Sequence, residues 1–155
     1  MNRLSRAGII LGLLFATPWP GRSLEHQQQG SPDPAAPVLT LNGDAAVITI
    51  LIKPDKTADF ELVLSKLKEA LQHSSKPERK AQAAGWTVFK SMQLAQGNAV
   101  YVMRIDPVVK GEEYDITRLI AEAFPVEVRD LFLKYKEAFA GRGITEMVRY
   151  SSMQD

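Results

Sequence analysis

The chain of 155 residues has the length of a single domain, and its lack of cysteine excludes disulfides, iron–sulfur clusters, thiolate zinc sites, a cysteine nucleophile and a lipid-modified N-terminal cysteine. The formal net charge is +1, but Arg3, Arg6 and Arg22 supply three of the 19 basic residues, and the rest of the chain has 16 Lys and Arg against 18 Asp and Glu. Nucleic-acid binding therefore has no electrostatic support.

Residues 1–23 have the pattern of a secretory signal peptide. Arg3 and Arg6 precede an apolar run at 7–16, and small residues around 21–23 suit cleavage by a signal peptidase. The alternative is a membrane anchor, but this run falls well short of the roughly 20 residues that a span needs. We expect cleavage, export to the periplasm or the outside, and no stable membrane span afterwards.

Residues 24–43 are predicted to be a disordered linker. The segment is rich in Gln, then in Gly, Ser, Asp and Pro, and this composition does not pack a core. His26 lies within it, and a lone histidine in such a tract is expected to be solvated. The folded domain is predicted to span residues 44–153.

The run AAVITILIK at 45–53 predicts a strand in the middle of a sheet. Its β-branched residues favour a strand, and apolar residues occupy both faces. One face has Ala46, Ile48, Ile50 and Ile52, and the other has Val47 and Leu51. Both faces of this strand must therefore be covered.

An amphipathic helix is predicted from about Thr57 to His73, with Thr57 or Asp55 as its N-cap. A short second helix is predicted over 77–85, because proline suits its first turn and glycine its end. The next two segments, 86–92 and 99–106, are predicted to be the strands of a hairpin.

The C-terminal third is predicted to contain two helices and a last strand. Asp115 can cap a helix that stops at Pro125, since proline clashes with a continuing helix. A further helix over about 126–139 is predicted to end at two glycines, and residues 144–150 are predicted to form an edge strand.

This order of elements predicts an α+β, ferredoxin-like βαββαβ fold with a four-stranded antiparallel sheet and helices on one face. The two central strands are apolar on both faces, so the second face needs a cover. A second copy of the same sheet, in a two-fold homodimer, is the simplest one. The alternative is a monomer in which the long N-terminal tract covers that face, with Val38, Leu39 and Leu41 doing part of the covering.

Three stretches, ITILIKPDKTADFELVLSKLKEAL, GWTVFKSM and NAVYVMRIDP, together with the element order over 45–153, resemble the dimeric α+β barrel superfamily. Its members include antibiotic-biosynthesis-monooxygenase-like and stress-responsive barrel proteins. The resemblance implies a dimeric barrel with a small-molecule pocket between sheet and helices. It implies no particular reaction, since the superfamily includes monooxygenases, haem-degrading enzymes, haem peroxidases, isomerases and members without known chemistry.

No motif for a phosphate loop, a zinc protease, a serine hydrolase or a calcium loop is present. His73 is the one candidate for binding haem, but a position near a helix C-terminus explains it more simply. The carboxylates Asp55 and Asp59, and those within 112–115, stand at predicted helix starts, where capping accounts for them. We expect no catalytic residue, no metal site and no cofactor.

The candidate ligand-binding residues are aromatic, apolar or cationic: Trp86, Phe89, Tyr101, Met103 and Arg104, with Tyr114, Phe124 and Arg149 as further candidates. Arg104 is a charge within an apolar central strand, where it needs a partner or a ligand. The alternative is that the aromatics belong to the core and the arginines pair with nearby acids or a partner subunit.

Two hypotheses about function remain. The first is a non-catalytic exported dimer that binds a small apolar or weakly acidic molecule, or that serves only as an interaction module. The second is a cofactor-independent monooxygenase that holds a phenolic or quinone-like substrate between Trp86 and Tyr101. The lack of a convincing acid–base residue in the sheet favours the first.

Overall fold

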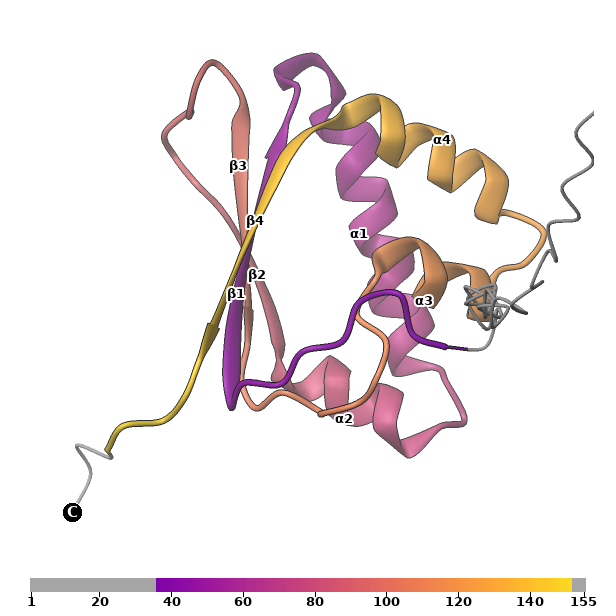
Figure 1. Ribbon diagram of the computed structural model, residues 1–155. Coiled ribbons are helices and arrows are strands. Elements are labelled where there is room, and N and C mark those ends of the chain that lie inside the picture. Colours follow the sequence, from indigo (N-terminus) through magenta and orange to yellow (C-terminus); the bar gives the residue numbers. More distant parts are fainter. Residues whose placement is uncertain (1–35, 152–155) are drawn as a thin grey trace, which may run out of the picture. The chain divides into compact units, whose positions relative to one another are not determined.

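The computed structural model describes residues 36–151. Four strands form one antiparallel sheet in the order β2-β3-β1-β4, and the helices lie on one of its faces (Figure 1). The strands are β1 (Ala45–Ile52), β2 (Trp86–Lys90), β3 (Ala99–Ile105) and β4 (Phe139–Met147). The helices are α1 (Thr57–Gln72), α2 (Pro77–Gly85), α3 (Ile116–Ala123) and α4 (Val128–Ala138), with a short 3₁₀ turn, η1 (Pro54–Lys56). The predicted α+β, ferredoxin-like fold is confirmed.

The core lies between the sheet and the helices. Alternate residues of β1 are buried, because successive side chains of a strand point to opposite faces. Ile48 is paired with Met103 of β3 on one side and with Ile144 of β4 on the other. From the helices, α1 contributes Phe60 and Leu67 to this core.

The two predicted helix caps differ in outcome. The Asp115 carboxylate accepts hydrogen bonds from the backbone N–H groups of Thr117 and Arg118, both at 3.0 Å, as predicted for α3. Neither Thr57 nor Asp55 caps α1 with its side chain. That prediction is wrong because the 3₁₀ turn η1 leads directly into the helix.

Residues before the predicted domain boundary at residue 44 also pack in the folded core. Leu41 is fully buried in the core and Leu39 packs against it. Glu113 holds this segment, because its carboxylate accepts hydrogen bonds from the N–H groups of Val38 and Leu39 at 2.7 and 3.0 Å. Residues 39–41 therefore pack with the helix-side core and do not cover the opposite face of the sheet.

The last strand begins earlier than predicted. β4 starts at Phe139, directly after α4, and Gly141 and Gly143 lie within it. Glycine usually interrupts regular structure, which is why a loop was the natural prediction. Pairing with β1 overrides this preference, because Gly141 is opposite Leu51 and Gly143 is opposite Thr49.

The predicted signal peptide, most of the predicted linker and His26 lie outside the described residues. Within residues 36–151, no helix combines the length and the apolar character that crossing a membrane requires.

Candidate functional site

The sheet face turned away from the helices is called the open face below. Figure 1 shows helices on only one side of the sheet, and no described segment covers the other side. The strand register assigns to the open face Val47, Thr49 and Leu51 of β1, Val100, Val102 and Arg104 of β3, Thr87 and Phe89 of β2, and Gly141, Gly143, Thr145 and Met147 of β4. The centre of this face is therefore apolar, with threonines and glycines around it.

Arg104 is the charged residue of the open face. It is the sixth of the seven residues of β3, beside Val47 and Thr87, so it lies toward the end of the strand and is exposed. Within residues 36–151, its guanidinium forms no ion pair. The predicted need for a partner or a ligand rests on burial of this charge, and in the single chain Arg104 is exposed to solvent.

The other predicted ligand-binding residues occupy different environments. Met103 and Tyr101 are buried in the core. Phe89 is on the open face with 53% of its surface exposed. Trp86 is half-buried on the helix side of the edge strand β2. The five residues therefore lie in separate places on the two faces of the sheet, and Trp86 lines a pocket.

That pocket is a groove of about 510 Å³ between α1 and β2. Its apolar wall contains Leu64, Leu67, Leu71, Ala83, Trp86 and Val88, and its polar lining contains Glu61, Ser65, Lys68, Gln72 and Thr87. The indole Nε1 of Trp86 is buried, and among the described residues it has no hydrogen-bond partner. A buried Trp N–H usually finds an acceptor, but this one is shielded from solvent, so the groove does not present it to a ligand.

A polar cluster joins one end of the groove to the core. The Tyr101 hydroxyl donates to Glu61 Oε1 at 2.7 Å, and Lys90 Nζ donates to the same oxygen at 2.7 Å. Hydrogen bonds from Lys90 and Tyr101 lower the pKa of Glu61. Burial and the bond to Glu61 raise the pKa of Tyr101. This phenol is thus held protonated and engaged, so it is poorly suited to act as a base.

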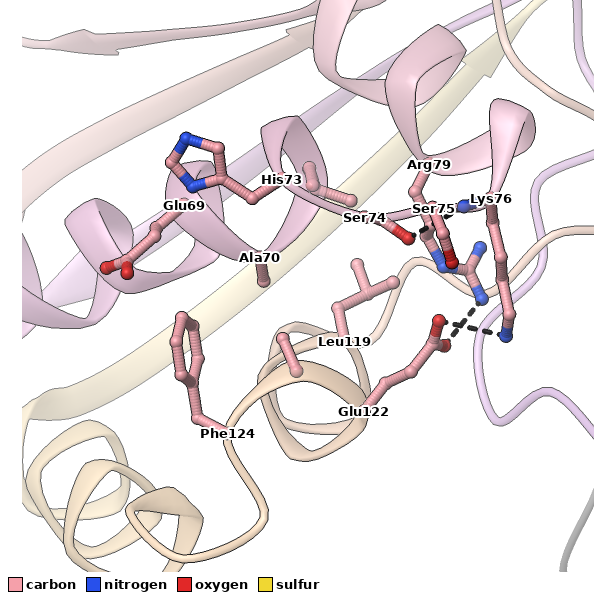
Figure 2. Close-up of a pocket in the computed structure, with 12 residues that line it drawn as sticks. Glu69, Ala70, His73, Ser74, Ser75, Lys76, Arg79, Leu119, Glu122 and Phe124 are labelled. Atoms are coloured by element: carbon pink, nitrogen blue, oxygen red, sulfur yellow. Dashed lines mark hydrogen bonds and ion pairs between the residues drawn. The ribbon is translucent and has the colours of Figure 1, made fainter.

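A second pocket, of about 420 Å³, lies between the end of α1, the start of α2 and α3 (Figure 2). On one side of it, Arg79 is only 7% exposed and pairs with Glu122 at 3.0 Å, while Lys76 reaches the same carboxylate at 2.9 Å. Arg79 also pairs with Glu112 at 2.8 Å. Since the charges are matched in pairs, this network ties α2 to α3 and to the loop before it.

Burial alone raises the pKa of Glu122, but the hydrogen bonds from Lys76 and Arg79 outweigh it and the net pKa is lowered. The carboxylates flagged in the sequence within 112–115 have structural partners in the same region: Glu112 binds Arg79, Glu113 binds the segment at 38–39, and Asp115 caps α3. A catalytic role for these acids finds no support in this arrangement.

His73 lies on the rim of the second pocket, at the C-terminal end of α1. Its backbone N–H donates to Glu69 O at 3.0 Å. No cluster of three or more His, Cys, Asp or Glu side chains suited to a metal occurs in the part of the chain that the structure describes. The helix-end interpretation of His73 agrees with this placement.

No protein-family model matches the chain, and no curated protein matches it. Among solved structures, the chain is similar to a dimeric ferredoxin-like protein of unknown function from Thermobifida fusca YX. The two are 16% identical with a TM-score of 0.31, over 72% of this chain and 96% of that one. A likeness this weak carries no argument about assembly or activity. Membership of the dimeric α+β barrel superfamily remains a prediction.

Proposed function

We propose that this protein is a homodimeric interaction module in which the open face of one copy packs against the open face of another. The observation that carries the proposal is the uncovered apolar centre of the sheet, where Val47, Val102 and Phe89 lie on adjacent strands. Soluble monomers rarely leave a contiguous apolar surface of this kind in water. A second copy supplies a matching surface by symmetry, because a two-fold interface uses the same patch on both subunits.

The geometry of such a dimer follows from sheet packing. Two sheets stack face to face at about 10 Å, with side chains from both inner faces filling the space between them. The bare positions at Gly141 and Gly143 leave room for larger side chains of the partner. Arg104, near the end of β3, reaches the rim of this interface and stays hydrated there.

The test is a charge placed at the centre of the open face. Val102→Glu puts a carboxylate between Thr49 and Phe89, where dimerisation would bury it without a partner. Sedimentation velocity of the unaltered protein is expected to show association, and the variant is expected to sediment as a smaller species because it loses the open-face interface. Leu62→Glu, an exposed position on α1, is the matched control and keeps the association of the unaltered protein. Equal association of V102E and the unaltered protein contradicts the proposal.

Export is part of the same proposal, and it rests on the sequence of residues 1–23. The module then acts in the periplasm or outside the cell. Expression of the full chain, followed by intact mass measurement of the mature protein, is expected to show removal of the N-terminal segment. Recovery of the uncleaved chain in the cytoplasm contradicts this part.

Small-molecule binding in the groove between α1 and β2 is a second candidate function. The observation that favours it is the apolar wall of the groove, where Trp86 lies with Leu64, Leu67 and Leu71. A ligand with an apolar body would contact this wall, and Lys68 on the groove suits a weakly acidic group. The Tyr101 hydroxyl already donates to Glu61, so it is not free to orient a phenolic substrate as the oxygenase hypothesis requires.

The groove is tested with 8-anilinonaphthalene-1-sulfonate, an apolar anion whose fluorescence rises on binding. Lys68→Glu reverses an exposed charge that lines the groove, so it is expected to weaken binding of this anion by about 2- to 10-fold. Lys136→Glu, at an exposed cation on α4, is the control. Equal binding by K68E and the unaltered protein excludes the groove as the binding site.

A further inference from the structure

The outer edge of β4 is unpaired within the described part of the chain. β4 pairs with β1 on one side and stands at the end of the strand order. It has nine residues, whereas protected edge strands are usually short, and eight of the nine are exposed. Such an edge presents a row of free backbone N–H and C=O groups to another strand.

The sequence of β4 also suits close approach of a second backbone. Gly141 and Gly143 have no side chain, and a Cβ at Gly143 would meet no atom within 4 Å. Glycine inside a strand often marks a place where another backbone comes close. The register with β1 is regular from Gly141 to Met147, so this stretch is straight enough to form a second ladder.

The charges of β4 are self-complementary about one point. Arg142 and Glu146 lie two residues before and two residues after Ile144, on the same side of the sheet as Ile144. In an antiparallel pair of β4 strands centred on Ile144, Arg142 of each copy stands opposite Glu146 of the other. A centre moved by one residue in either direction places a charge opposite Ile144, so the charges select one register.

Arg142 and Glu146 are both able to form this ion pair between two β4 strands. The Arg142 guanidinium forms no ion pair within residues 36–151. Glu146 uses Oε2 to accept the N–H groups of Asn42 and Gly43, at 2.6 and 2.7 Å, and its Oε1 is left for another donor. Charges on edge strands usually discourage association. Here the opposite signs are placed symmetrically, so they attract in a two-fold pair.

We propose that β4 is a second association surface, which pairs edge to edge with β4 of another copy around a two-fold axis at Ile144. The two sheets then continue as one eight-stranded sheet. This surface is separate from the open face, so each contact forms or fails without the other. Its two-fold axis is normal to the sheet, whereas the axis of a face-to-face dimer is parallel to it.

The test uses the absence of cysteine in the chain. Ile144→Cys places one thiol at the proposed axis, where opposing Cα atoms of an antiparallel pair are about 4.5–5.5 Å apart, within disulfide range. The matched control is Val88→Cys on the other edge strand, since Val88 is 39% exposed and Ile144 is 36% exposed. Both changes are made in a full chain that carries V102E, so that open-face pairing does not contribute.

With diamide as oxidant, I144C is expected to form a covalent dimer at least about tenfold faster than V88C. Adding Arg142→Glu is expected to slow the I144C reaction about tenfold, because it places like charges opposite each other. Equal rates for I144C and V88C overturn the proposal.

Amide hydrogen exchange of V102E alone is an independent measurement. The pairing is supported if the protection of β4 amides rises with protein concentration and the protection of β2 amides does not. Exchange that is independent of protein concentration in both strands overturns the proposal.

Discussion

Glu146 shows how one side chain in the last strand holds the start of the folded domain. Its carboxylate accepts the backbone N–H groups of Asn42 and Gly43, more than 100 positions away in the chain. These hydrogen bonds hold the pKa of Glu146 below its ordinary value of 4.5. The residue therefore fixes the segment that carries Leu41 into the core.

Glu146→Gln is expected to make the loss of stability in acid more gradual. A lowered pKa in the folded state contributes stability that is complete above pH 4.5 and is lost as pH falls through the folded pKa, below 4.5. The variant lacks this contribution at all pH values. Urea unfolding at several pH values between 2.5 and 7 measures the slope, with Glu78→Gln as a control for loss of a surface carboxylate. Identical slopes for E146Q and the unaltered protein contradict the assignment.

Arg79 illustrates a residue whose importance the sequence hides. It stands in a polar segment, Pro77–Gly85, where a charged residue is expected to be solvated. In the structure it is buried and pairs with Glu112 and Glu122. The burial of Arg79 arises only from the packing of α2 against α3, so no local sequence pattern predicts it.

Arg79→Met is expected to destabilise the fold by about 2 kcal/mol. Removal of one partner of a fully buried ion pair costs about 3–5 kcal/mol, but the Glu122 and Glu112 side chains are 35% and 30% exposed and recover hydration. Chemical denaturation measures the change. Lys80→Met, an exposed cation on the same helix, is the control and is expected to be near neutral. A cost equal to that of K80M shows that the network is not stabilising.

At the scale of elements, the sequence predicts the helices, strands and caps that depend on a local pattern of residues. The β-branched run of β1, the apolar stripe of α1 and the cap of α3 all depend on neighbouring residues, and the structure confirms them. The start of β4 at Phe139 depends on pairing with a strand nearly 90 residues away. Its glycines predict a loop locally, and only the sheet makes them part of a strand.

The junction of α2 and β2 depends on Gly85. A Cβ at this position would lie 2.8 Å from the backbone oxygen of Pro107, which cannot move aside as a side chain does. Gly85→Ala is expected to destabilise the fold by about 1–3 kcal/mol through this overlap. Gly141→Ala is the control, because its Cβ would meet the Leu51 side chain at an ordinary 3.6 Å. Thermal unfolding compares the two, and equal melting temperatures contradict the expected overlap.

At the scale of the whole molecule, the apolar character of both faces of β1 and β3 predicts that the face away from the helices needs a cover. The structure agrees as far as residues 36–151 go, since residues 39–41 pack with the helices and no described segment covers the open face. The candidate site was harder to predict. Trp86 is the one of the five candidates that lines a groove, because the positions of Tyr101, Met103 and Phe89 depend on which face of the sheet the helices cover.

The central claim, that the open face pairs with a second copy, is tested most directly by the solution mass of the Arg142→Glu variant, measured by light scattering behind a sizing column. This variant removes the charge complementarity of the β4 edge, so a remaining dimer is held by the open face. The expected mass is twice that of the mature chain. A mass equal to one chain would contradict it.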